Sequence, residues 1–240
     1  MSQHAHPPTP EQVEIVRWAA SLGAITAEAL ALRLRTTPTS ARARLAVARR
    51  RGLLLRDRPL VGRPALFTVT RAGLRACGVR GIDPCRISAQ GAHHLTVCAL
   101  AAAALEHCYP THRLIGEREL RRDEREHGRP LASAQFGALH DGEYRRHRPD
   151  LVLWPADCEG ASPVAVEVEL TIKAPRRLVE ICRAWARCRA VAGVLYLAPT
   201  AVEGALSRAL AEVRAGGQIV VVPLNALPGV DLDADTGAWA

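Results

Sequence analysis

The chain has 240 residues, 48% of them hydrophobic, which is enough for one large or two modest globular domains, and a formal net charge of +8 at pH 7. No stretch approaches the roughly 18 uninterrupted apolar residues of a membrane-spanning helix, and the first residues do not begin a secretory signal. We therefore expect a soluble, cytoplasmic protein without a membrane partner, and no feature indicates a small-molecule substrate.

The cysteines indicate reduced thiols. There are seven, without a C-x-x-C pair, and their odd number argues against a full set of disulfides. Two groupings resemble zinc ligands: His93 and His94 with Cys98, and His107 and Cys108 with His112. Neither has the matching second pair that a structural zinc site needs.

Charge divides the chain more clearly than any linker. Residues 1–88 hold 15 arginines against 5 acids, a net charge of +10, whereas residues 89–240 have a net charge of −2. We predict a DNA-binding domain over 1–88, a second domain over 89–228 and a flexible tail over 229–240. A basic patch can also serve acidic proteins or solubility, but its extent favours nucleic acid.

The basic region has the pattern of three short helices followed by a hairpin. The predicted helices cover residues 10–22, 27–35 and 38–51. Two β-like segments, 53–56 and 66–69, enclose a polar turn with arginines at its tip, and another helix begins near Thr70. Residues 10–78 together resemble a winged helix-turn-helix domain.

In such a domain the third helix enters the major groove by its N-terminal half, and the wing lies on phosphates or in the minor groove. The base-reading candidates are Thr39, Ser40, Arg42 and Arg44, and the wing candidates are Arg58 and Arg63. Arg49, Arg50 and Arg51 follow at the far end of the helix, where contact with the DNA backbone or with the helix C-terminus is expected. Winged helices also mediate protein contacts, which is the alternative interpretation.

The rest of the chain predicts an α/β domain with a mixed sheet. Its elements follow the order α-β-β-β-α-β-α-β, at residues 92–107, 111–116, 151–154, 164–171, 175–188, 193–198, 201–215 and 218–224. Between the first two strands, residues 123–148 are polar and charged. We expect a long loop or a hairpin there.

One predicted strand, residues 164–171, has acids on alternate positions. Glu167, Glu169 and the lone lysine, Lys173, would share one face, with the two carboxylates about 7 Å apart. Two such carboxylates are costly unless they are solvated or paired with cations, and a divalent metal with a nearby amine would resolve this. The alternative is a solvent-facing sheet edge, with the acids paired to Arg176 or Arg177.

These residues resemble the PD-(D/E)XK nuclease-like superfamily, which combines Pro149-Asp150 with a strand carrying Glu167-x-Glu169. With the winged helix in front, the chain resembles the replication-relaxation family of actinobacterial plasmids and other mobile elements. The similar stretches are His94-Leu95, Glu117-Arg118-Glu119-Leu120-Arg121, Arg148-Pro149-Asp150 and Val166-Glu167-Val168-Glu169-Leu170-Thr171. The resemblance covers most of residues 10–225.

The resemblance implies a bacterial protein with a Mg²⁺ or Mn²⁺ site. Asp150 and Glu167 would bind the metal, Glu119 could add a ligand, and Glu169 or Lys173 would manage the attacking water. The chain departs from the family pattern because Glu169 stands where a lysine is usual. Lys173 lies four positions further on, and it reaches the metal only if the chain bends before Pro175.

Two function classes follow from this pattern. The first is a metal-dependent DNA endonuclease with Asp150, Glu167, Glu169 and Lys173 as its catalytic set. The second is a non-cleaving DNA-binding factor for replication, transfer or transcription. Both predict double-stranded DNA as the partner, and a homodimer is expected because duplex sites are usually two-fold.

Overall fold

A computed structural model describes residues 6–138, 144–156 and 160–230 of the chain. It divides into two compact units, Met1–Ala99 and Leu100–Ala240. The division falls inside helix α5 (Ala89–Cys108), later than the boundary at 88/89 that charge suggested. The predicted tail lies outside the described residues from position 231 onward.

The first unit opens with three helices whose first turns are capped locally. They are α1 (Pro10–Leu22), α2 (Ala27–Arg33) and α3 (Pro38–Arg50). Threonine hydroxyls at positions 9, 26 and 37 accept hydrogen bonds from backbone N–H groups in the first turn of each helix. The second helix is shorter than predicted, because Arg35 adopts a left-handed φ of 50°.

A two-stranded hairpin follows these helices. β1 (Leu54–Asp57) pairs antiparallel with β2 (Leu66–Val69), and Ile25 forms a further bridge to Phe67. Helix α4 (Arg71–Ala76) then packs so closely on the chain before β1 that a Cβ on Gly73 would lie 2.2 Å from the Leu53 carbonyl oxygen. The helices and hairpin enclose a core of Ile15, Ile25, Leu30, Leu45, Leu54 and Leu66.

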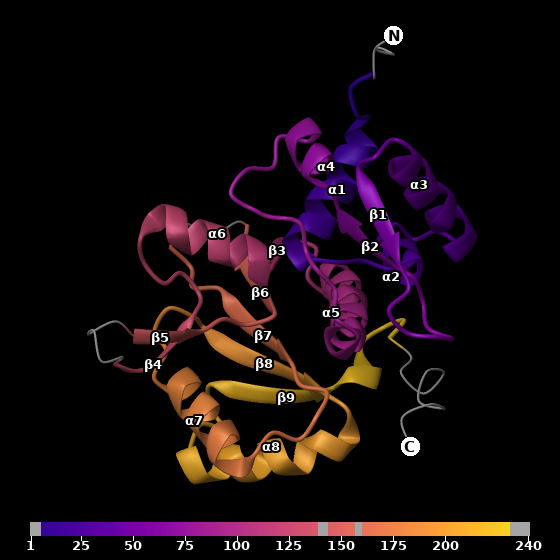
Figure 1. Ribbon diagram of the computed structural model, residues 1–240. Coiled ribbons are helices and arrows are strands. Elements are labelled where there is room, and N and C mark those ends of the chain that lie inside the picture. The colour runs from indigo at the N-terminus through magenta and orange to yellow at the C-terminus, as the bar shows by residue number, and fades with distance from the viewer. Residues whose placement is uncertain (1–5, 139–143, 157–159, 231–240) are drawn as a thin grey trace. The chain divides into compact units, whose positions relative to one another are not determined.

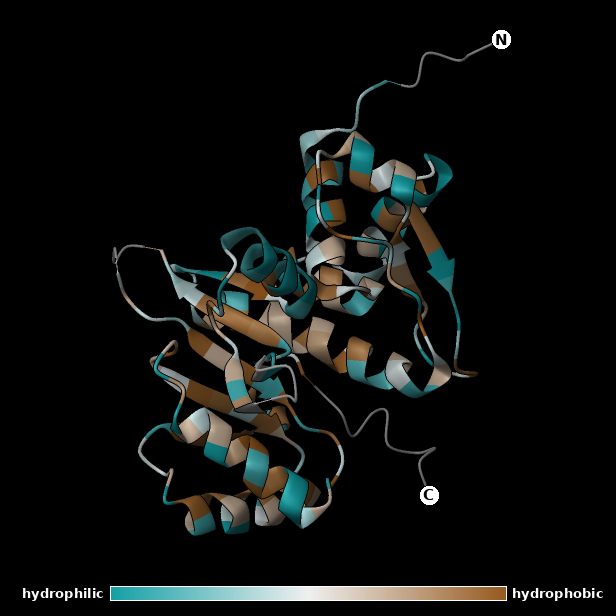
Figure 2. Ribbon diagram, turned by 60° about the vertical axis from the view of Figure 1, so that its left-hand side comes forward, coloured by the Kyte–Doolittle hydropathy of each residue, from teal (hydrophilic) through white to brown (hydrophobic). Residues whose placement is uncertain are grey.

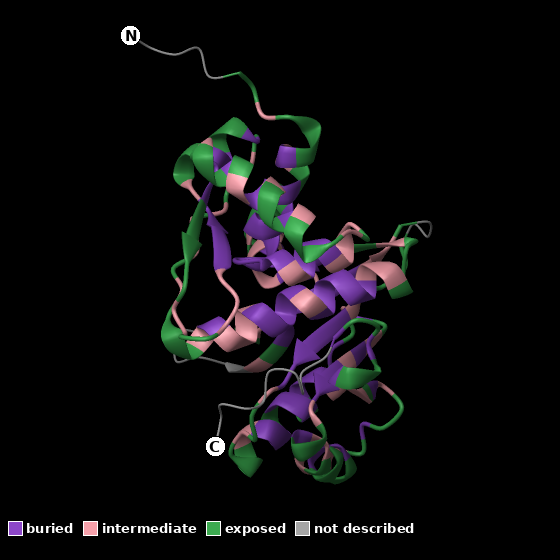
Figure 3. Cartoon of the chain, turned by 90° about the vertical axis from the view of Figure 1, so that its right-hand side faces the viewer, coloured by how far each residue is buried: buried purple, intermediate pink, exposed green. Residues whose placement is uncertain are grey.

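Helix α5 is long, apolar and buried over much of its length, as Figure 3 shows. Its alanines at 99 and 101–104 have no solvent exposure. The alanine-rich sequence had predicted a helix here, from 92 to 107, and the structure extends it at the start. No helix in the described part of the chain is both long and apolar enough to cross a membrane.

The second unit is built on a five-stranded mixed sheet in the order β3-β6-β7-β8-β9 (Figure 1). The strands are β3 (His112–Gly116), β6 (Leu151–Pro155), β7 (Val164–Val168), β8 (Gly193–Ala198) and β9 (Ile219–Pro223). The pairs β3-β6 and β6-β7 are antiparallel, and the pairs β7-β8 and β8-β9 are parallel. The predicted α/β class with a mixed sheet is confirmed.

Helices α7 (Pro175–Ala186) and α8 (Thr200–Val213) connect the parallel strands and pack against each other (Figure 1). Their apolar faces share one core with the sheet, which includes the large buried side chains Trp185 and Tyr196. A short 3-10 helix, Leu224–Ala226, follows β9. In the strand order of the sheet, β7 is the middle strand. The alternative of a solvent-facing edge strand is therefore wrong.

The polar segment 123–148 proved to be more structured than a loop. Its first residues complete helix α6 (Glu117–His127), which Figure 2 shows as largely hydrophilic. β4 (Ala134–Ala138) and β5 (Tyr144–His147) then pair antiparallel, in agreement with the hairpin alternative. α6 was missed because its sequence is polar on nearly every side, with Leu120 as its one buried apolar residue.

No disulfide joins the described cysteines, which lie at positions 77, 85, 98, 108, 182 and 188. Cys158 lies outside the described residues.

Candidate functional site: an arginine hollow and a buried acid cluster

The first unit has a hollow of about 370 Å³ between α3 and the β1-β2 hairpin. Four arginines line it: Arg42, Arg49, Arg56 and Arg58. We call this feature the α3 hollow. It places positively charged groups from a helix and from a hairpin on the same surface.

The sequence spacing explains the convergence. Arg42, Ala46 and Arg49 lie three or four positions apart on α3, so they share one face of that helix. Arg56 and Arg58 come from β1 and the residues directly after it. All four guanidinium groups belong to exposed residues, and guanidinium is the side chain best suited to phosphate.

Most of the positive charge that lines the α3 hollow is not neutralised by described carboxylates. Arg42 pairs with Glu28 of α2, which also lines the hollow, at 2.8 Å. In the part of the chain that the structure describes, Arg49, Arg56 and Arg58 have no carboxylate partner within 4 Å. Three cations are thus available to a ligand, and the fourth is shared with Glu28.

Two of the six predicted DNA contacts lie in the α3 hollow, namely Arg42 and Arg58. Arg44 turns instead to α1, where it forms an ion pair with Glu11. Thr39 is exposed and Ser40 is half-buried near the start of α3, and Arg63 is half-buried in the hairpin turn. None of these three lines the hollow.

Arg49 and Arg56 were not among the predicted base or wing contacts. The signal for Arg49 was its position seven residues after Arg42, two turns along one helix face. Arg56 lies two residues before Arg58, and therefore on the same side of an extended segment. Only the folded hairpin shows that both segments meet at one hollow.

In the second unit, Glu167 is buried in the middle strand, with 6% of its surface exposed. Its Oε1 atom receives a hydrogen bond from the Trp185 indole N–H at 2.9 Å. The same oxygen lies 2.6 Å from Nε2 of His147, at the end of β5. Strand β7, helix α7 and the β4-β5 hairpin each contribute one member of this cluster.

Burial raises the pKa of Glu167 above its ordinary value, against the opposing effect of His147. Burial also lowers the pKa of His147, but the charge and hydrogen bond of Glu167 outweigh it, so that the pKa of His147 is raised. Both shifts favour the protonated forms. The pair therefore holds a proton to a higher pH than a free histidine would.

Asp150 lies one residue before the β6-β7 pair Leu151↔Val166, and Glu167 lies one residue after it. Because facing residues of antiparallel strands share a side of the sheet, the register predicts that these two acids are neighbours. The Asp150 Oδ2 atom accepts a hydrogen bond from the Val168 N–H at 2.8 Å. Its carboxylate thus ties the start of β6 to the end of β7.

Lys173 lies close to Glu169 in the segment after β7. Glu169 is buried, and Lys173 folds back to form an ion pair with its Oε2 atom. Arg176 and Arg177, the alternative partners for the strand acids, are not bonded to Glu167 or Glu169. Lysine and acid therefore neutralise each other beside the Glu167 cluster.

Glu119 lies on α6 and pairs with Arg122 of the same helix at 3.2 Å and with Arg113 of β3 at 2.5 Å. Among the described residues, the carboxylates of Asp150, Glu167 and Glu119 do not form a group whose oxygens all lie within 4.8 Å of one another. The three acids therefore do not converge on one position, and a magnesium ion would be held by one or two of them with water as the other ligands. The metal site stays a prediction.

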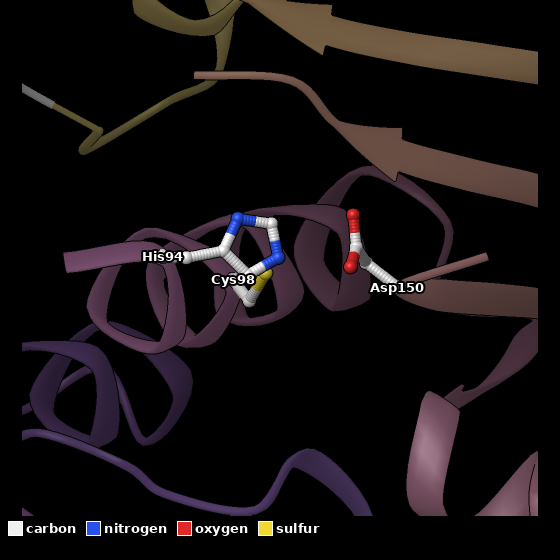
Figure 4. A group of neighbouring side chains, drawn as sticks. All are labelled: His94, Cys98 and Asp150. Carbon is white, nitrogen blue, oxygen red and sulfur yellow. The ribbon is translucent and has the colours of Figure 1, made fainter. Parts of the chain in front are cut away.

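Figure 4 shows two residues of a possible zinc grouping, His94 and Cys98, one turn apart on α5. They belong to the first unit. The Asp150 side chain in the same figure belongs to the second unit, at the start of β6. None of the three side chains is without an interaction partner.

The residues of the acid cluster that sequence patterns missed are His147 and Trp185. Trp185 lies in the helix predicted over residues 175–188, and the structure adds an N–H donor to its place in the core. His147 directly precedes Arg148-Pro149-Asp150. Arg148 itself binds the buried carboxylate of Glu124 at 2.9 Å.

The comparisons add no family assignment. The chain matches no protein-family model, no curated protein and no solved structure.

Proposed function

We propose that this protein binds double-stranded DNA through a winged helix-turn-helix first unit, and that its second unit is a PD-(D/E)XK-like domain that does not cleave. The observation that carries the proposal is the α3 hollow, where Arg42, Arg49, Arg56 and Arg58 converge. Exposed guanidinium groups on a helix and an adjoining hairpin are suited to the phosphates that flank a groove.

The order of elements supports this proposal. Three helices followed by a β-hairpin and a fourth helix are typical of a winged helix, with α3 as the recognition helix and β1-β2 as the wing. The net charge of +10 over residues 1–88 provides the electrostatic attraction. The exposed Thr39 at the start of α3 remains a candidate for base contact.

The state of the second unit's acids favours a non-cleaving role. A nuclease needs carboxylate oxygens that are open to a metal and to water. Here Glu167 is buried under His147 and Trp185, and Glu169 is neutralised by Lys173. Metal binding would first have to displace these protein partners.

An endonuclease is the second candidate because of one observation. Asp150 and Glu167 occupy facing positions on neighbouring strands, which is the arrangement that a two-carboxylate metal site uses. In that case Mg²⁺ or Mn²⁺ would supply the Lewis acid and the activated water.

In either case we propose a homodimer acting on two-fold DNA sites of a bacterial plasmid or mobile element. Replication, transfer or transcription would be the process that it regulates. A dimer would repeat the α3 hollow on successive turns of the major groove. Its mass in solution, with and without duplex, tests this part of the proposal.

The function is tested with the full chain, a labelled duplex and supercoiled plasmid in Mg²⁺ or Mn²⁺. We expect the duplex to show increased fluorescence anisotropy and the plasmid to remain supercoiled. Nicking that disappears in Asp150→Asn would select the endonuclease. The absence of any duplex binding would overturn both candidates.

A further inference from the structure

The second unit has a basic groove of its own, along α7 and the β4-β5 hairpin. A hollow of about 400 Å³ there is lined by the arginines Arg145, Arg177, Arg183 and Arg187. An adjoining hollow of about 590 Å³ shares Gln135, Phe136, Ala184 and Arg187 with the first and adds Arg189. Because they share these lining residues, the two hollows form one continuous surface, the α7 groove.

The spacing along α7 produces one wall of this groove. Arg177, Ala184 and Arg187 lie seven and three positions apart, and therefore on one face of the helix. Ten residues of helix span about 15 Å, which is the rise along the duplex axis of roughly four phosphates of one strand. The length of the groove suits a chain of phosphates better than a single anion.

The concentration of arginines contrasts with the rest of this part of the chain. Residues 89–240 have a net charge of −2, with 16 arginines and one lysine against 19 acids. Within the α7 groove, Glu180 is the one acid among the lining residues, against five arginines. Positive charge is thus gathered on one surface although the surrounding chain is slightly acidic.

Most of this charge is available to a ligand. Arg177 and Arg183 form long, exposed pairs with Glu180 at 3.5 Å and Glu212 at 3.9 Å. For Arg145 and Arg187, no carboxylate partner occurs within the described ranges. Exposed pairs of this kind contribute little stability, so a phosphate can replace them.

Contacts between aromatic rings form the base of the groove. The Arg177 guanidinium lies over the Phe136 ring at 4.7 Å, and the Phe136 ring meets the His147 ring edge-to-face at 5.7 Å. His147 in turn contacts Trp185. The cluster around Glu167 thus lies against the base of the groove, to which Arg177 is joined through Phe136.

We propose that the α7 groove binds the phosphate backbone of duplex DNA, as a second contact besides the α3 hollow. This inference rests on the proposed DNA-binding function. Guanidinium contacts to phosphate carry no sequence information, so the α7 groove adds affinity and salt dependence without base preference. The α3 hollow would then select the site, and the α7 groove would strengthen the complex.

The test uses the full chain and two labelled duplexes of unrelated sequence. The groove variant combines Arg145→Gln, Arg183→Gln and Arg187→Gln. Its matched control, Arg125→Gln, Arg129→Gln and Arg208→Gln, removes the same charge from exposed positions of the second unit outside the groove. A third protein carries the four α3-hollow arginines as glutamine. Thermal melts verify that every variant is folded.

At about 0.1 M salt we expect the groove variant to lose roughly tenfold or more in affinity for both duplexes, and the control to lose about threefold or less. Equal affinity of the groove variant and the control would overturn the inference and leave the proposed function intact. If the groove variant weakens binding and the α3-hollow variant does not, the α3 hollow is not the contact that selects the site. Phosphate binding by the α7 groove is then still supported. A wild-type chain that binds neither duplex would overturn both.

Discussion

The α3 hollow of the first unit and the acid cluster of the second unit differ in how their charges are satisfied. The first displays cations on its surface, where Arg49, Arg56 and Arg58 have no acid partner among the described residues. The second buries acids in and directly after its middle strand, where Glu167 and Glu169 each bind protein donors. Exposed charge without an internal partner is available to a ligand, whereas buried and satisfied charge stabilises the fold that contains it.

This contrast bears directly on function. Acids alternating along a strand are compatible with a metal site and with an internal hydrogen-bond network. Their surroundings distinguish the two, and here the donors are histidine, tryptophan and lysine side chains. The buried acid cluster of the second unit is therefore not where we expect ligand binding, in contrast to the exposed arginines of the α3 hollow.

The largest expected effect is on DNA affinity. Replacing Arg42, Arg49, Arg56 and Arg58 with glutamine should weaken duplex binding by about 100-fold or more near 0.1 M salt. Each phosphate contact releases counterions, and losing one contact lowers the association constant by up to about tenfold at this salt concentration. Fluorescence anisotropy measures the dissociation constant. The matched control, Arg17, Arg71, Arg75 and Arg80 to glutamine, removes exposed charge elsewhere in the first unit. Equal losses in both variants would show that net charge, and not the α3 hollow, determines binding.

The next effect concerns the buried acid cluster. His147→Ala removes one of two donors to a buried carboxylate, and should lower the free energy of unfolding by about 1–3 kcal/mol. Urea denaturation measures the change. His127→Ala, at the exposed end of α6, is the control and should change stability by about 0.5 kcal/mol or less. If the two variants were equally stable, the interpretation of Glu167 as a structural acid would be wrong.

A pH dependence follows from the same pair. The folded-state pKa values of Glu167 and His147 both lie above their ordinary values of 4.5 and 6.5, so the folded protein binds more protons than the unfolded chain. The stabilisation from His147 is complete below pH 6.5 and is lost as the pH rises through its raised pKa. We expect melting temperature to fall over that range in the wild type, and to fall less in His147→Gln. If the melting temperature instead rose as the pH increased through the titration of His147, the raised pKa values of His147 and Glu167 would be contradicted.

The smallest effect distinguishes two arginines of one helix. Arg44 pairs with Glu11 and lies outside the α3 hollow, whereas Arg49 lines it. Arg44→Gln should therefore change duplex affinity by about twofold or less, and Arg49→Gln by roughly fivefold or more. A larger loss for Arg44→Gln would restore the sequence-based assignment of Arg44 as a base-reading residue.

The sequence predicted local structure well where the determinants are local. Threonine caps at positions 9, 26 and 37 and the prolines after two of them fix the helix starts of the first unit within a few residues. Alternating and continuous apolar runs identified all five strands of the mixed sheet. Helix α6 and the exact bounds of strands β4 and β5 were not predicted, because their sequences have little apolar periodicity.

The candidate sites depend on contacts between distant segments, and this limited the prediction. The pairing of His147 with Glu167 joins residues twenty positions apart, and that of Trp185 with Glu167 joins residues eighteen apart. Arg44 and Arg42 look equivalent in sequence, and only the folded structure shows that Arg44 pairs with Glu11 of α1. A bend before Pro175 is the condition under which the sequence lets Lys173 reach a metal, and the structure brings Lys173 to Glu169.

The most direct test of DNA binding by the α3 hollow is the salt dependence of duplex affinity. The logarithm of the association constant should fall linearly with the logarithm of salt concentration in the wild type. In the variant with glutamine at Arg42, Arg49, Arg56 and Arg58, we predict a slope that is shallower by about three to four, at roughly 0.9 per lost phosphate contact. A slope identical to that of the wild type would show that these arginines do not touch DNA.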